Sequence, residues 1–156
     1  MIRDVLLHPH PLLTRRAEPA TDPGAVIADL HDTMRSFGHC VGIAAPQIGE
    51  LVRVAVVDVT GHPKATTSHG ELVLVNPVIV ERSGDEVGRE GCLSIPELTG
   101  NVRRATEVTV EAEGMRVESA GFEARALQHE IDHLDGLLFL DRVESLEADV
   151  FLRKRR

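Results

Sequence analysis

The chain has 156 residues, 42% of them hydrophobic and 27% charged, which is the balance of a single soluble globular domain over residues 1–156. A formal net charge of −8 argues against direct DNA binding, and no apolar run approaches the roughly 20 residues of a membrane span. The N-terminal residues lack the apolar stretch and cleavage site of a secretory signal, so a cytoplasmic protein is expected.

The first predicted element is a helix over residues 24–37. It follows an extended, proline-containing segment, and Asp22 is the predicted N-cap with Pro23 in the first turn. Apolar residues recur at helical spacing up to Phe37, and Gly38 is expected to end the helix.

Strands are predicted to dominate the middle of the chain. Residues 40–49 contain too much Gly and Pro for a regular element, whereas the β-branched residues 51–59 indicate a buried strand. A polar loop over residues 61–70 is followed by two strands, with a bend at Asn76-Pro77.

The second half is predicted to contain a hairpin and a longer helix. Residues 90–96 form a constrained segment, while 107–114 alternates as a half-exposed strand that pairs with 115–121 across Gly114. Residues 121–134 have helical periodicity, and Ser145 is a candidate cap for a short last helix. This order of elements predicts an α+β fold rather than alternating βαβ units.

The predicted helix contains the sequence QHEIDHLDG, in which His129 and His133 are four residues apart. Residues at this spacing lie on one face of a helix, so the two imidazoles can converge on one metal ion. Glu130 follows the first histidine and is placed to take a proton from a metal-bound water. The alternative is a solvated helix that carries a few titratable groups.

A catalytic site of this type needs a third protein ligand. No histidine follows Gly136, and the acidic residues after it show no ligand spacing. Cys92 is the upstream candidate, in a segment bounded by Gly91 and Pro96. A thiolate is a good donor to a divalent ion, although a lone cysteine is more often a small buried apolar residue.

Three segments together resemble the peptide deformylases over nearly the whole chain. They are VGIAAPQIG at residues 41–49, EGCLSIP at 90–96 and QHEIDH at 128–133. The resemblance implies strands packed around a central metal-binding helix and one ion per chain, Fe²⁺, for which Zn²⁺, Ni²⁺ or Co²⁺ can substitute. It makes Cys92, His129 and His133 the metal ligands, Glu130 the general base and acid, and Gln47 with the Leu93 backbone N–H the groups that hold the oxyanion.

The same resemblance implies that the chain removes formyl groups from N-formylmethionyl nascent peptides. The substrate would lie extended beside Gly42 and Gly49, and Val41, Phe122 and Leu127 are candidates for the methionine pocket, with core packing as an equal alternative. Two rival readings are a metalloprotease with another third ligand and a non-enzymatic metal or formyl-peptide binder.

Several residues have open assignments. Glu90 either orients a neighbouring group or is a surface charge, whereas Asp132 and Asp135 are expected to be helix-surface charges. The remaining histidines are expected on the surface or in loops; they are His8, His10, His31, His39, His62 and His69.

The chain also departs from the family pattern. Cys40 replaces a usual glycine and places a thiol near the expected cleft. An arginine that some members carry after the second motif is missing, with Arg103 or Arg104 as possible replacements. The basic C-terminal segment FLRKRR, residues 151–156, is either a solvated tail or a contact with the ribosome.

Overall fold

The structure of the protein, a computed structural model, describes residues 1–153. Its helices are α1 (Gly24–Ser36) and α2 (Gly121–Leu134), with short 3-10 helices η1 (Pro11–Thr14), η2 (Ala45–Ile48) and η3 (Phe139–Asp141). The strands are β1 (Gly42–Ala44), β2 (Val54–Val57), β3 (Leu72–Val75), β4 (Val78–Ser83), β5 (Glu86–Cys92), β6 (Ile95–Arg104), β7 (Glu107–Ala112), β8 (Met115–Ala120) and β9 (Val150–Leu152).

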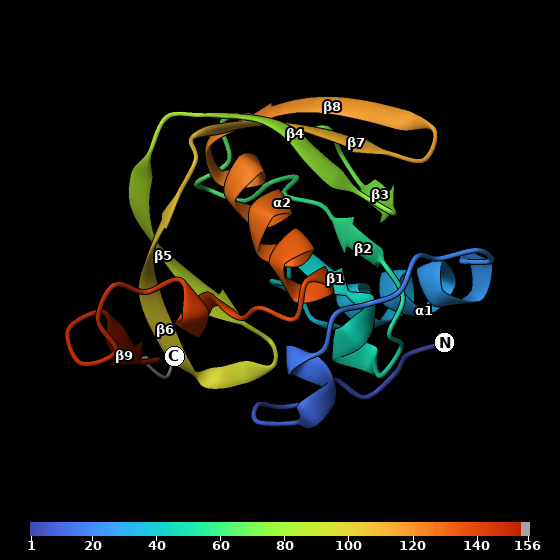
Figure 1. The fold of residues 1–156 in the computed structure, drawn as a ribbon, viewed down its shortest axis with the longest axis horizontal. Coiled ribbons are helices and arrows are strands. Elements are labelled where there is room, and N and C mark those ends of the chain that lie inside the picture. Colours follow the sequence, from blue (N-terminus) through green and yellow to red (C-terminus); the bar gives the residue numbers. More distant parts are fainter. Residues whose placement is uncertain (154–156) are drawn as a thin grey trace.

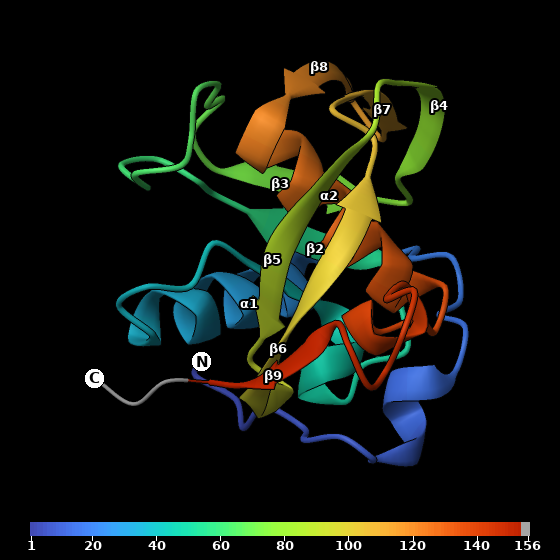
Figure 2. The same ribbon diagram turned by 90° about the vertical axis from the view of Figure 1, so that its left-hand side faces the viewer.

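The strands form three antiparallel sheets of three strands each within the described residues. Their strand orders are β1-β2-β3, β4-β7-β8 and β5-β6-β9. The sheets surround α2, which runs through the middle of the molecule, while α1 lies outside against β1 and β2 (Figures 1 and 2). The predicted α+β class with a central helix is therefore confirmed.

The helix α2 is buried because strands and loops enclose it. Every residue from Ala126 to Leu134 is buried, including polar ones, although the helix is amphipathic by sequence. Its apolar residues share one core cluster with β2, β3, β7 and β8. A buried helix needs partners for each of its polar side chains, and this requirement shapes the site described below.

The other predicted elements agree with the structure to different degrees. The helix predicted at residues 121–134 is α2, and the hairpin across Gly114 is β7 and β8. Asn76, with φ of 51°, separates β3 from β4 as predicted for the bend. The first helix has no side-chain cap from Asp22, because Pro23 occupies the N-cap position.

Three predictions about local structure were wrong. Residues 40–49 are not irregular, because β1 pairs with β2 and Pro46 lies in the first turn of η2. The constrained segment at 90–96 is the turn of a long hairpin, β5 and β6, whose charges and glycines concealed its strands. Ser145 caps a turn rather than a helix, since its Oγ accepts only from Ala148 N at 3.1 Å.

The C-terminal segment contributes a strand to the fold. Residues Val150–Leu152 form β9, which pairs with β6. The predicted tail is therefore partly a strand, although Phe151 and Leu152 stay exposed to solvent as predicted, and residues 154–156 lie outside the described residues. Neither α-helix is long and apolar enough to cross a membrane in the part of the chain that the structure describes.

Candidate metal centre and substrate cleft

A cysteine and two histidines meet at the centre of the molecule. The helix α2 carries His129 and His133 one turn apart on one face, and Cys92 ends β5 opposite them. Their donor atoms all lie within 4.8 Å of one another, and all three residues are buried. One sulfur and two imidazole nitrogens form a donor set typical of a divalent transition metal, so these residues fit such an ion.

The electrostatics of this group favour the charged form of the cysteine. Its Sγ lies 3.3 Å from His133 Nε2. Burial alone would raise the pKa of the Cys92 thiol, but the charges and hydrogen bonds of His133 and His129 bring that pKa well below its ordinary value of 9.0. A thiolate is the form in which cysteine binds a metal.

Glu90 fixes the orientation of His129. The Nδ1–H of His129 donates to Glu90 Oε1 at 2.8 Å, which leaves Nε2 as the nitrogen available to an ion. Burial opposes the charge on Glu90, but hydrogen bonds from Arg104 and His129 lower the pKa of its carboxyl far below the usual range. Two roles were left open for Glu90, and the structure supports the one in which Glu90 orients a neighbouring side chain rather than that of a surface charge.

Glu130 lies in a confined space beside Cys92, His129 and His133, which together are called the metal group below. Its Oε1 is buried and makes no hydrogen bond within residues 1–153, so this oxygen is available to a ligand. Burial raises the pKa of the Glu130 carboxyl above its ordinary value of 4.5. A Cβ at Gly42 would lie only 2.7 Å from Glu130 Oε2, which explains why β1 has a glycine at this position.

Gln47 is held with its amide nitrogen toward the metal group. Its Oε1 accepts from Ala44 N at 2.9 Å, while Nε2 donates to Ser94 Oγ at 3.1 Å and to Cys92 Sγ at 3.5 Å. Leu93 follows Cys92 in the two-residue turn between β5 and β6. The structure thus brings Gln47, Leu93 and the three predicted metal ligands into one place.

A cleft of about 2160 Å³ opens onto this group. Val41, Gly42 and Phe122, predicted to contact the substrate, line it. Leu127 does not, because its side chain is completely buried in the core cluster around α2. Two edge strands border the cleft, β1 through Gly42 and β5 through residues 89–92.

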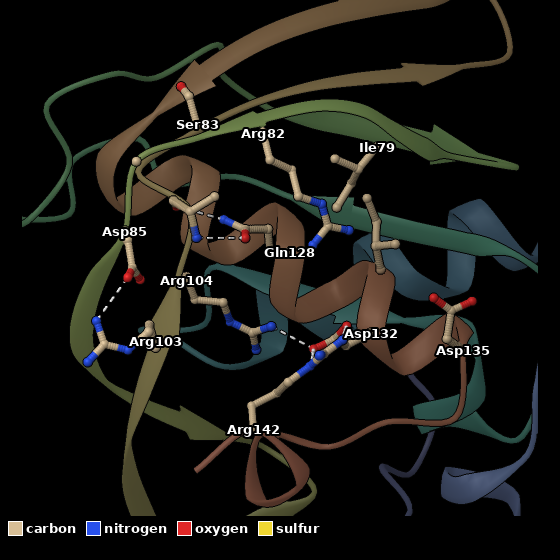
Figure 3. A pocket seen from close by; sticks show the side chains of 13 residues that line it. Ile79, Arg82, Ser83, Asp85, Arg103, Arg104, Gln128, Asp132, Asp135 and Arg142 are labelled. Carbon is tan, nitrogen blue, oxygen red and sulfur yellow. Dashed lines mark hydrogen bonds and ion pairs between the residues drawn. The ribbon is translucent and has the colours of Figure 1, made fainter. Parts of the chain in front are cut away.

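Asp132 is not the surface charge that helical spacing predicted. It is buried, and its carboxylate accepts from Arg104 Nη1 at 2.6 Å and from Arg142 at 3.0 and 3.1 Å. This cluster lines a smaller hollow of about 420 Å³. Figure 3 shows it beside the part of α2 that carries Gln128 and Asp132. Asp135 is half-buried and pairs with Arg53 at 2.9 Å, so it is only partly a surface charge.

Arg104 connects the two faces of α2. Its guanidinium donates twice to Glu90, at 2.9 Å each, and once to Asp132, while Arg125 donates to Glu90 at 2.7 Å. Arg104 is therefore part of the support of the metal group and does not reach the cleft. Arg103 points the other way and pairs with Asp85 and Glu144, so neither arginine replaces the missing one.

Sequence reasoning missed three contributors to the site. Ser94 is completely buried and orients Gln47, and its position inside the second motif was the available signal. Arg125 supports Glu90 from α2. His62 was expected to be a plain loop residue, yet it lines the cleft and stacks on Phe122 with ring centroids 4.2 Å apart.

Cys40 lines the cleft, as its place in the sequence predicted. Its Sγ donates to the carbonyl oxygen of Gly42 at 3.1 Å. Burial is the main cause that raises the pKa of this thiol to about 12, whereas the neighbouring imidazoles lower the pKa of Cys92.

Comparison with known proteins agrees with this geometry. Residues 2–149 match the family described as polypeptide deformylase. The chain belongs to the polypeptide deformylase family.

Relatives and solved structures cover nearly the full chain. A peptide deformylase of Acidobacterium capsulatum is 40% identical over 165 residues, covering 100% of this chain and 95% of its own. The crystal structure of a peptide deformylase from Legionella pneumophila has a TM-score of 0.83 at 38% identity, covering 94% of this chain and 89% of that one. A Met-Ala-Ser-bound class I type b deformylase from Acinetobacter baumannii has a TM-score of 0.79 at 37% identity, with coverages of 91% and 99%.

Family membership decides between the readings that the sequence left open. Members remove N-terminal formyl groups, so this chain is a metal-dependent hydrolase of that class. The metalloprotease and the non-enzymatic binder are thereby set aside. The residues of the chain that could hold a metal ion together are Cys92, His129 and His133, within the described residues.

A substitution of Arg104 tests the contribution of the buried ion pairs to stability. Arg104→Met removes the cation between Glu90 and Asp132 and leaves two buried carboxylates without it, which should destabilise the fold by about 3–5 kcal/mol. Denaturant unfolding measures the change. Arg103→Met is the matched control on the same strand, and its midpoint should barely move because Arg103 is exposed. Equal shifts for the two variants would contradict the role given to Arg104.

A substitution of Gly42 tests whether β1 confines the Glu130 side chain. In Gly42→Ala the new methyl group displaces the Glu130 carboxylate, and a misplacement of about 1 Å costs on the order of 10²-fold in kcat. The free energy of unfolding should fall by about 1–3 kcal/mol, as for other overpacked sites, because the buried Glu130 side chain must shift from Cγ outward. Gly24→Ala is the control, because nothing lies within 4 Å of its added Cβ. Full activity in Gly42→Ala would contradict the expectation that a confined Glu130 side chain is needed for turnover.

Proposed function

We propose that the chain hydrolyses the formyl amide of N-formylmethionyl peptides with one Fe²⁺ held by Cys92, His129 and His133. Zn²⁺, Ni²⁺ and Co²⁺ are expected to bind the same donors, because sulfur and imidazole ligands accept each of these ions. The observation that carries the proposal is the joint placement of the three donors and the unpaired Glu130 carboxylate at one end of the cleft. A bound divalent ion supplies Lewis-acid polarisation and a lowered pKa for water.

Glu130 is the proposed proton carrier. Its free Oε1 takes a proton from the attacking water as the oxygen of that water bonds to the formyl carbon. The same carboxyl then gives this proton to the amine nitrogen as the carbon–nitrogen bond breaks, so formate and a free amino terminus leave. A carboxyl with a raised pKa suits both transfers, because it is a stronger base than an exposed glutamate.

Gln47 and Leu93 are the proposed donors to the formyl oxygen as negative charge develops on it. The Gln47 amide is oriented by Ala44 and Ser94, and only its 3.5 Å contact with Cys92 Sγ must be exchanged for the substrate. The Leu93 N–H comes from the two-residue turn that directly follows Cys92. Donors fixed in this way are each worth about 3 kcal/mol in the transition state.

The peptide is proposed to bind as an extended strand in the cleft. Edge strands have backbone groups free to pair with an added strand, and β1 and β5 both present an edge here. Val41 and Phe122 are the proposed contacts of the methionine side chain, with Gly42 beside the peptide backbone. The related Acinetobacter baumannii structure with bound Met-Ala-Ser supports a tripeptide of this kind as a ligand.

Formate release tests the proposal directly. The chain, loaded with Fe²⁺ without oxygen, should release formate from formyl-Met-Ala-Ser. Glu130→Gln should keep its metal and lose about 10²–10⁴-fold in kcat. Glu118→Gln, an exposed residue of β8, is the control and should be fully active. The roles assigned above fail if Glu130→Gln keeps wild-type kcat, or if no formate is released with any of Fe²⁺, Ni²⁺, Co²⁺ or Zn²⁺.

We also propose that the enzyme works in the cytoplasm on chains emerging from the ribosome, with the basic residues 154–156 as a contact to ribosomal RNA phosphates. The test is a variant with glutamine at all three positions, since a deletion from residue 151 would also remove part of β9. Its co-sedimentation with ribosomes should weaken and become less sensitive to salt, with tripeptide turnover unchanged. Unchanged co-sedimentation would remove this proposal.

A further inference from the structure

The C-terminal strand forms one wall of the substrate cleft. In β9, Leu152 pairs with Leu98 and Phe151 pairs with Thr99 of β6. The pairing continues one residue further, because Arg153 N donates to Glu97 O at 2.8 Å. Leu152 and Arg153 both line the cleft as a result, together with Glu97 and Thr99 of β6. Figure 2 shows β9 crossing the lower ends of β5 and β6.

The guanidinium of Arg153 lies directly over Gly91. A Cβ added at Gly91 would collide with Arg153 Nη2, and the next nearest atom outside Arg153 would be Thr99 Cγ2 at 3.6 Å. The missing side chain at Gly91 is therefore what allows Arg153 to lie against β5. Gly91 precedes Cys92 in β5, and both residues line the same cleft as Arg153.

Arg153 has no ion pair or side-chain hydrogen bond within residues 1–153. The nearby Arg89, by contrast, donates to Thr99 and Asn101 and stacks on Phe151, with 4.0 Å from its Cζ to the ring centroid. The acidic residues that line the cleft do not neutralise Arg153. Asp58 pairs with Arg35, Glu90 with Arg104 and Arg125, and neither Glu97 nor Glu130 forms an ion pair with Arg153.

We infer that Arg153 is a substrate-positioning residue that favours peptides with a carboxylate side chain at the second or third residue. The inference rests on the proposed function, because the formyl group must lie at Cys92 for the following residues to pass Gly91. A strand advances about 3.3 Å per residue, so a peptide beside β5 brings its second or third side chain within reach of the guanidinium. A guanidinium binds a carboxylate through paired N–H donors.

The experiment compares two pairs of peptides, all amidated at the C-terminus. The first pair is formyl-Met-Ala-Glu and formyl-Met-Ala-Gln, and the second is formyl-Met-Glu-Ala and formyl-Met-Gln-Ala. Amidation removes the terminal carboxylate, so only the side chain differs within each pair. The wild type should prefer the Glu peptide of at least one pair by about two- to five-fold in kcat/KM, through KM and not kcat. High salt should reduce the preference, because the pair is exposed to solvent.

Arg153→Gln should abolish the preference and Arg153→Lys should keep part of it. Arg103→Gln, which removes an exposed arginine outside the cleft, should leave it intact. Equal turnover of Glu and Gln peptides by the wild type, or an undiminished preference in Arg153→Gln, would overturn the inference and leave the proposed function standing. No formate from any of these peptides would instead count against the proposed function.

Discussion

The carboxylate of Glu90 is the interaction on which the site depends. It accepts from His129 and Arg104, which are both buried, and from the half-buried Arg125. An ionised carboxylate can be buried only when cations and donors surround it, and here those partners also fix the His129 ring. The same contacts therefore satisfy the buried charge and orient a metal-binding nitrogen.

The position of α2 explains why such a network is needed. Two histidines, Glu130 and Asp132 lie on the part of α2 that three sheets enclose, residues 126–134, where every side chain is buried and only the side toward the cleft can receive a ligand. Each polar group of that helix must be paired inside the protein or reserved for a ligand. Asp132 is paired with two arginines, whereas Glu130 Oε1 and His133 Nδ1 are unpaired within the described residues. The oxygen of Glu130 is the one that borders the cleft, and it is the atom to which we assign chemistry.

The sequence predicts this site better than it predicts the sheet that supports it. Periodicity and the HExxH spacing define α2 and two donors, because both are local patterns, and the family resemblance adds Cys92 and Gln47. The strands β5 and β6 were missed because glycines and charges interrupt their alternation. The pairing of Asp132 with Arg104 joins residues 28 apart in sequence, and no local pattern distinguishes a buried charge from an exposed one. The place of Arg153 likewise follows from the pairing of β9 with β6.

The central claim is that one sulfur and two imidazole nitrogens bind the same ion. X-ray absorption spectroscopy of the metal-loaded protein at the metal edge reports the ligand types directly, without reference to activity. The account predicts a coordination shell with one sulfur scatterer and two imidazole rings, the remaining position being occupied by oxygen. A shell of nitrogen and oxygen alone would contradict it, because Cys92 would then not be a ligand.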